Sequence, residues 1–229
     1  MHDVQMRWQA ILDSISRASE KAGRNPEEIE LMAVSKTHPY EEISELFACG
    51  QLLFGENRVQ EAEQKFPLAR PVGMDLHLIG HLQSNKAKKA ITLFDAIDSV
   101  DTLKLADKLE SLLSKPMPIL LEYKTAHNDS EKSGFTTPDE LFFALEKLAD
   151  FRYLTVRGLM TIGPLGASES ETRKAFSTLY NLGEQAKLRF PSLDFSTLSM
   201  GMSQDYAWAI EEGATRIRIG TALFGARAT

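Results

Sequence analysis

Apolar runs of strand length alternate with amphipathic helical segments along almost the whole of this 229-residue chain. The predicted strands cover residues 29–35, 52–55, 75–80, 95–100, 117–123, 154–161, 193–200 and 215–221. Strands that alternate strictly with helices are expected to be parallel, because parallel neighbours need a crossover connection that is usually helical. The chain is therefore expected to build one parallel sheet of eight strands.

Apolar side chains recur at helical spacing between these strands. A leading helix is predicted over residues 4–22 and is closed by Gly23, and a second begins at Pro39, runs through Phe47 and stops at Gly50. Further helices are predicted over residues 84–93, 102–113, 139–148, 169–187 and 203–212, followed by a short tail at 222–228.

A sheet of eight parallel strands either stays open or closes into a barrel. No Gly-x-Gly-x-x-Gly follows the first strand, which disfavours an open dinucleotide-binding sheet, and the number of strands favours closure. No linker, low-complexity tract or further repeat interrupts the alternation. The sequence predicts an α/β fold, a single-domain (β/α)8 TIM barrel over residues 1–229 with an extra N-terminal helix.

The composition argues against several classes of protein. The chain has 26 Lys plus Arg against 32 Asp plus Glu, and this net charge of −6 disfavours nucleic acid and anionic membranes as partners. The single cysteine, Cys49, cannot form an internal disulfide, and the five His residues show no metal-ligand spacing. No secretion signal or long apolar span is evident. We therefore expect a cytoplasmic protein with no metal site.

Barrel active sites lie at the C-terminal ends of the strands, so residues that close the predicted strands are candidates. They are Lys36, Asn57, His77, Met160, Ser199 and Arg218. Lys36 closes an otherwise apolar strand, and burial at the barrel mouth favours the neutral, nucleophilic amine that forms Schiff bases. The alternative is a surface lysine just past the strand end.

Two glycine turns follow the seventh and eighth predicted strands. Glycine lets backbone N–H groups approach an anion closely, and Ser and Thr hydroxyls add donors. Phosphate sites recur at this place in barrels, and the alternative is a pair of ordinary turns. The candidate phosphate-binding residues are Ser199, Gly201, Met202, Ser203, Gly220 and Thr221.

A Schiff-base lysine with a phosphate cradle describes a site for a phosphorylated aldehyde, and pyridoxal 5′-phosphate (PLP) fits that description. Arg216 and Arg218 share one face of the last strand, and Arg218 is the nearer to its C-terminal end. Arginine stays protonated, so Arg218 would donate to the pyridine nitrogen, keep it unprotonated and weaken the electron sink. The alternative is that Arg218 pairs with an acidic residue inside the barrel.

Six ordered motifs carry a resemblance to a known family over nearly the whole chain. They are Ala33-Val-Ser-Lys-Thr37, Phe54-Gly-Glu-Asn57, His77-Leu-Ile-Gly-His-Leu-Gln-Ser-Asn-Lys86, Arg157-Gly-Leu-Met160, Ser199-Met-Gly-Met-Ser203 with Asp205, and Arg218-Ile-Gly-Thr-Ala222 with Phe224-Gly-Ala-Arg227. With them the chain resembles the YggS/PROSC-type pyridoxal phosphate homeostasis proteins, whose barrel is similar to the N-terminal domain of alanine racemase.

The resemblance implies a role for each candidate. Lys36 would be the aldimine lysine, and Arg218 would lie near the ring nitrogen. Asn57 and His77 would line the pocket, while Met160 and Met202 are expected in its wall or in the core. The residues implied around the phosphate are Ser199, Gly201, Gly220 and Thr221.

One segment departs from the family pattern. Lys124 stands where the family commonly has an asparagine, and the loop at 125–132 is slightly longer than usual. This departure puts the hydrogen bonding near the end of the fifth strand in doubt, and it touches neither Lys36 nor the phosphate cradle.

Two kinds of function fit such a site. A PLP-dependent amino-acid racemase or lyase needs a second acid/base residue on the face of the substrate opposite Lys36. Alanine racemases, which this barrel resembles, take that residue from an additional C-terminal domain, and this sequence stops at Thr229, just past strand eight. We therefore expect a non-catalytic protein that holds PLP and supplies it to apoenzymes, with free amino acids as further partners.

Overall fold

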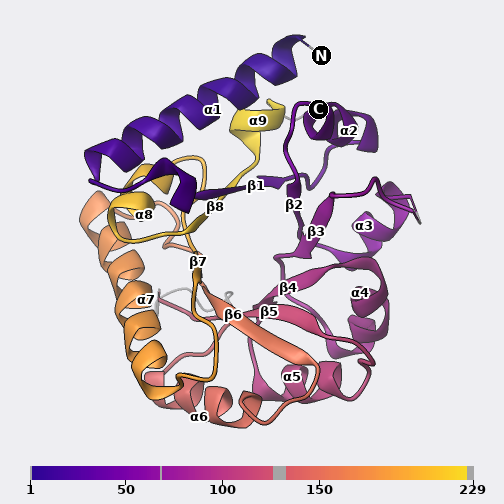
Figure 1. Cartoon of the computed structure of the whole chain (residues 1–229), viewed down its shortest axis with the longest axis vertical. Helices are drawn as coiled ribbons and strands as arrows, with labels where there is room; N and C mark the ends of the chain where they lie inside the picture. Colours follow the sequence, from indigo (N-terminus) through magenta and orange to yellow (C-terminus); the bar gives the residue numbers. More distant parts are fainter. Residues whose placement is uncertain (1, 68, 126–132, 226–229) are drawn as a thin grey trace.

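The computed structural model describes residues 2–67, 69–125 and 133–225, and its eight strands form a closed parallel barrel in the order β1 to β8 (Figure 1). The pairing of β8 with β1, which places Arg216 opposite Glu30, closes the ring. The strands are β1 (Glu30–Val34), β2 (Leu53–Glu56), β3 (Asp75–Leu78), β4 (Ala96–Val100), β5 (Met117–Glu122), β6 (Leu154–Met160), β7 (Thr197–Ser199) and β8 (Arg216–Ile219). The predicted (β/α)8 barrel is confirmed.

Helices surround this barrel, and the leading helix packs across one side of the ring against α8, α9 and α2 (Figure 1). The α-helices are α1 (His2–Lys21), α2 (Tyr40–Ala48), α3 (Val59–Lys65), α4 (Ala87–Leu93), α5 (Leu103–Glu110), α6 (Pro138–Leu148), α7 (Glu169–Arg189), α8 (Tyr206–Glu211) and α9 (Thr221–Phe224). Two single-turn 3₁₀ helices, η1 (Pro26–Glu28) and η2 (Ser84–Lys86), precede β1 and α4. Within the described residues, no helix is both long and apolar enough to cross a membrane.

Several element boundaries differ from the sequence prediction by a few residues, and three elements differ more. Helix α3 was not predicted, because only Val59 and Ala62 are buried within its seven residues. Strand β7 is shorter than the predicted 193–200, because the Asp194 carboxylate accepts the Ser196 N–H in a turn before the strand begins. The predicted tail at 222–228 begins with helix α9, whose Leu223 carbonyl accepts a hydrogen bond from Arg7 of α1.

Side chains alternate between the barrel interior and the helix-facing side of the strands. Met32 and Val34 of β1 join Leu53 and Ile79 in a small apolar cluster that is separate from the main core. Their neighbours on the strands, such as Leu31 and Phe54, belong to the main core between strands and helices. The even-numbered positions of β1 therefore face the interior, and Lys36 continues this series two residues after Val34.

Candidate functional site

Lys36 and Asn57 lie next to each other at the C-terminal rim of the barrel. Val34 of β1 is in register with Gly55 of β2, and each candidate stands two residues beyond its member of that pair. Lys36 is half-buried. The Asn57 Oδ1 atom is buried and has no hydrogen-bond partner among the described residues. An acceptor left without a donor at this rim points to a ligand that supplies one.

Arg218 joins the ends of three strands. Its guanidinium donates to the Ser199 hydroxyl at 2.8 Å and to the Thr161 carbonyl at 2.8 Å. Ser199 is in register with Met160 at the end of β6, and both are fully buried. Three of the predicted site residues therefore lie together on β6, β7 and β8. The Ser199 hydroxyl accepts from Arg218 and keeps its own hydrogen available for donation.

The turn after β7 requires glycine at position 201. Gly201 has a φ of +93°, and a Cβ there would lie 2.5 Å from the Ala209 Cβ atom. The Met202 N–H donates to the Asp205 carboxylate at 2.6 Å, which holds the turn against the start of α8. The N–H groups of Gly201 and Ser203 find no acceptor in the described part of the chain. The turn thus presents free donors at the strand end.

The turn after β8 brings the second half of the predicted phosphate cradle close to Lys36. A Cβ on Gly220 would lie 3.2 Å from the Val34 carbonyl oxygen, so the two backbones are in close contact there. Thr221 follows at the exposed start of α9, and its N–H group has no acceptor among the described residues. The turn therefore lies beside the end of β1, which leads into Lys36.

A buried carboxylate, Glu122, ends β5 in register with Met160. Burial is the main influence and raises the pKa of Glu122 to about 7, although the Ser133 hydroxyl donates to the carboxylate at 3.1 Å and lowers it. Burial also lowers the pKa of the fully buried Arg218. The interior between β5 and β8 is therefore a poorly solvated environment in which charge is costly.

Comparison with known proteins shows the family of this chain. The family described as the N-terminal domain of alanine racemase matches residues 7–228. A pyridoxal phosphate homeostasis protein from Vibrio alginolyticus is 39% identical over 99% of both chains, and one from Escherichia coli K12 is 39% identical over 99% of this chain and 98% of its own. The chain belongs to the pyridoxal phosphate homeostasis protein family. The family indicated by the six motifs is thereby confirmed.

Solved structures agree with this family assignment. PipY of Synechococcus elongatus with PLP bound is 37% identical, with a TM-score of 0.83 over 97% of this chain and 100% of that chain. Alanine racemase from Bacillus anthracis is 17% identical, with a TM-score of 0.70 over 96% of this chain and 57% of that chain. The second likeness shows the shared barrel alone.

His77 lies apart from the other candidates of this homeostasis-family chain. It is inside β3 rather than at its end, and its ring nitrogens lie 3.0 Å from Asp98 and 3.2 Å from Asp75. Arg216 donates to the other Asp98 oxygen at 2.8 Å. These side chains line a cavity of about 350 Å³ at the N-terminal end of the barrel, where Lys36 is not among the lining residues. A contact of His77 with a cofactor stays a prediction.

Asp75, His77, Asp98 and Arg216 form an ion cluster, and this cluster controls the charge of His77. Burial alone lowers the pKa of His77, but the charge of Asp98 and the hydrogen bonds to Asp75 and Asp98 outweigh it and raise the pKa to about 9. The ring is therefore protonated at neutral pH and donates from both nitrogens. Arg216, not Arg218, is the arginine that pairs with an acidic residue inside the barrel, Asp98, and it also donates to the half-exposed Glu30 at 2.6 Å.

The segment that departs from the family pattern is only partly described. The Lys124 N–H donates to the Phe135 carbonyl at 2.9 Å, and the Thr125 hydroxyl lies 2.9 Å from that of Thr161. The backbone after β5 is therefore paired in spite of the change to lysine. Residues 126–132 of the predicted longer loop lie outside the described residues.

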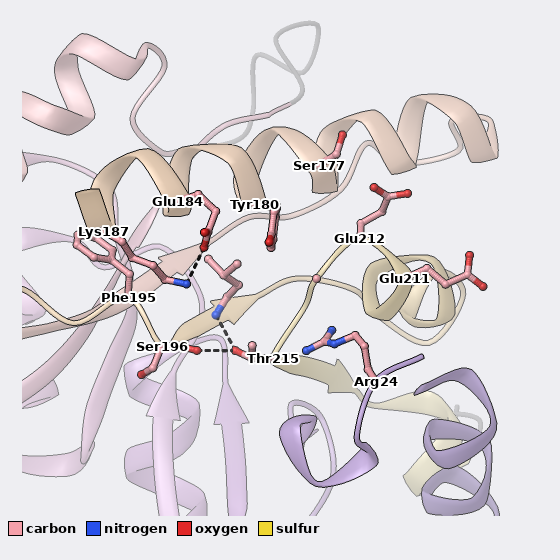
Figure 2. Close-up of a pocket in the computed structure, with 12 residues that line it drawn as sticks. Arg24, Ser177, Tyr180, Glu184, Lys187, Phe195, Ser196, Glu211, Glu212 and Thr215 are labelled. Atoms are coloured by element: carbon pink, nitrogen blue, oxygen red, sulfur yellow. Dashed lines mark hydrogen bonds and ion pairs between the residues drawn. The ribbon is translucent and has the colours of Figure 1, made fainter. Parts of the chain in front are cut away.

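A hollow of about 440 Å³ between α7 and the turn before β8 offers a different environment (Figure 2). Its charged groups are already paired, because Lys187 donates to Glu184 at 2.7 Å and Arg24 donates to the Ala214 carbonyl at 2.6 Å. The Thr215 hydroxyl donates to the Ser196 carbonyl at 3.0 Å and accepts from the Leu198 N–H at 2.8 Å (Figure 2). None of the candidate residues at the C-terminal strand ends lines this hollow.

Sequence reasoning missed one group of residues around Lys36. Glu61 and Lys65 of α3, with Glu56 at the end of β2, contact the backbone and side chains on both sides of Lys36. The signal was present in the spacing of Val59, Ala62 and Phe66 after the second strand, but it spans only two helical turns.

Proposed function

We propose that this chain binds PLP at the C-terminal end of the barrel, with Lys36 as its covalent anchor, and takes part in PLP homeostasis. The observation that carries this proposal is the approach of the β8 turn, with Gly220 and Thr221, to the end of β1 beside Lys36. An amine and a set of unpaired N–H donors then face one site. The names of the close relatives, and the PLP bound to PipY, support the same function.

The residues present fit such a cofactor. Asn57 offers a buried acceptor without a donor, which a hydroxyl or protonated group of the ligand would satisfy. Gly201 and Gly220 allow backbone N–H groups to approach a phosphate, and the hydroxyls of Ser203 and Thr221 add donors. Met160 is the buried apolar wall at the end of β6, and Met202 stands in the turn between the donors.

PLP, when bound, supplies an aldehyde carbon and a conjugated ring that withdraws electrons. Lys36 would supply the amine Nζ that holds the cofactor through this carbon. The phosphate would accept hydrogen bonds from the Ser199 hydroxyl and from the N–H groups of Gly201 and Thr221. Arg218, held by Ser199 and Thr161, would place a cation at the ring nitrogen and so disfavour its protonation.

We further propose that the protein is a carrier and not a racemase or lyase, because an arginine near the ring nitrogen weakens carbanion stabilisation. PLP would pass to apoenzymes, and free amino acids would exchange with Lys36. The proposal takes residues 1–229 as one PLP-binding domain. We also propose a cytoplasmic location, because the free Cys49 forms no disulfide and thiols stay reduced in the cytoplasm.

Two assays test the carrier proposal. Loaded protein mixed with an apo-transaminase should restore transaminase activity, and the Lys36→Ala variant should deliver less cofactor. L-amino acids incubated with the loaded protein in heavy water should gain little deuterium at Cα. Rapid deuterium exchange that Lys36→Ala abolishes would reject the carrier proposal in favour of a racemase or lyase.

A further inference from the structure

The segment that carries Lys36 has an unusual backbone. Thr37 has a φ of +67°, and it is the only residue other than glycine with a positive φ among those described. A β-branched residue in this region is sterically disfavoured and needs support from its surroundings. The support at Thr37 comes from outside the barrel, from helix α3.

The peptide groups on both sides of Lys36 bond to the same ion pair. Lys65 Nζ donates to the Ser35 carbonyl at 2.8 Å, and the Thr37 N–H donates to Glu61 Oε1 at 2.5 Å. Lys65 and Glu61 are themselves 2.9 Å apart and lie one helical turn from each other on α3. We call the Lys65–Glu61 pair the α3 clamp.

A buried carboxylate completes the arrangement. Glu56 Oε1 accepts from Lys65 at 2.8 Å and from the Ser35 hydroxyl at 2.5 Å, and the Glu56 side chain is fully buried. The Lys65 side chain is only 9% exposed. Paired charges this far from water are not explained by solubility, because exposed ion pairs would serve that purpose without the cost of desolvation.

The clamp acts on the face of the segment opposite to the Lys36 side chain. Ser35 is buried against Glu56 on the helix-facing side, and continuing the alternation of Met32 and Val34 directs Lys36 to the opposite, interior side. The amine at the rim is therefore free to react while its backbone is held from behind. Positioning of this kind matters because a displacement of about 1 Å can slow a reaction by about a hundredfold.

We propose that Lys65 and Glu61 are positioning residues that hold the backbone at Lys36 so that its amine meets the cofactor aldehyde. This inference rests on the proposed function, since it assigns the clamp to covalent capture by Lys36. Neither residue touches the cofactor in this proposal. Their loss should slow capture while the phosphate and ring contacts, which come from β6, β7 and β8, remain.

The test compares capture with non-covalent binding. Capture is followed by stopped-flow absorbance after mixing apo-protein with PLP, and pyridoxine 5′-phosphate, which lacks the aldehyde, reports the remaining contacts. Lys65→Met should slow capture about tenfold or more. Affinity for pyridoxine 5′-phosphate should stay within about twofold. Lys65→Arg, which keeps the charge, should recover most of the rate.

The matched control removes a different ion pair, which joins α3 to α4. Glu63 of α3 pairs with Lys89 at 2.8 Å, and both side chains are exposed, so Lys89→Met removes an ion pair from α3 without touching the clamp. This variant should capture PLP at the wild-type rate. If Lys65→Met fails to fold, Glu61→Ala replaces it, and hydrogen exchange in its apo form should show faster exchange at the Thr37 amide.

The outcomes separate the clamp from the cofactor site. A folded clamp variant that captures PLP at the wild-type rate would overturn the positioning role and leave the proposed function intact. Parallel losses of capture and of pyridoxine 5′-phosphate binding would also overturn it, because they would indicate a general collapse of the pocket. Wild-type protein that takes up no PLP would refute the proposed function and the clamp together.

Discussion

The ion cluster at the N-terminal end of the barrel should make folding stability fall as the pH rises above neutrality. His77 keeps its proton in the folded protein up to a pKa of about 9, whereas the ordinary value is 6.5. The unfolded chain therefore releases this proton first, and the stabilisation is complete below pH 6.5 and lost as the pH rises through 9. A displacement of this size corresponds to on the order of 3 kcal/mol.

The assay is urea unfolding of wild-type protein and the His77→Gln variant, followed by circular dichroism at a series of pH values from below 6.5 to above 9. His77→Gln should be less stable at the low end, because Asp98 and Asp75 lose a cationic partner. The difference between the two proteins should shrink as the pH rises. A difference that stays constant across this range would refute the assignment of a protonated His77.

Three further predictions concern other parts of the barrel. Glu122→Gln should stabilise the protein above pH 7 by on the order of 3 kcal/mol and have no effect near pH 4.5. The reason is that the raised pKa of Glu122 makes its ionisation unfavourable in the folded state. Urea unfolding at both pH values checks this. Thr221→Ala should weaken PLP binding by roughly ten- to a hundredfold. Isothermal titration should show no such loss for pyridoxal, and equal losses for both ligands would remove Thr221 from the phosphate site. Gly201→Ala should lower the melting temperature more than Gly166→Ala, since both have a positive φ but only the Cβ at 201 meets another atom within 4 Å; equal shifts would contradict the close packing of this turn.

The fold was predictable from local patterns because each strand and most helices carry their own signal. Lys36 stood out because it closes an apolar strand, and glycine at the strand ends marked the turns that carry Gly201 and Gly220. Helix α3 could not be predicted, because a two-turn helix buries too few residues to show a helical period. Its omission also hid the contacts of Lys65, which depend on where the helix crosses the loop.

The role of His77 could not be predicted because its partners are distant in the chain. Asp98 lies 21 residues after His77 in the chain. Arg216, which donates to the same carboxylate, lies 118 residues after Asp98. Their meeting depends on the register of β3, β4 and β8 inside the closed barrel. The spacing of residues near His77 carries no information about that register, whereas the motif at Lys36 depends mainly on its own strand.

Covalent mapping of bound PLP tests the central claim most directly. Protein incubated with PLP is reduced with borohydride, digested, and analysed by mass spectrometry for the pyridoxyl group. The group should be found on the peptide that contains Lys36, and Lys36→Ala should lose it while other lysines stay unlabelled. Labelling of another residue, such as Lys124, with Lys36 unmodified would contradict the assignment of the anchor.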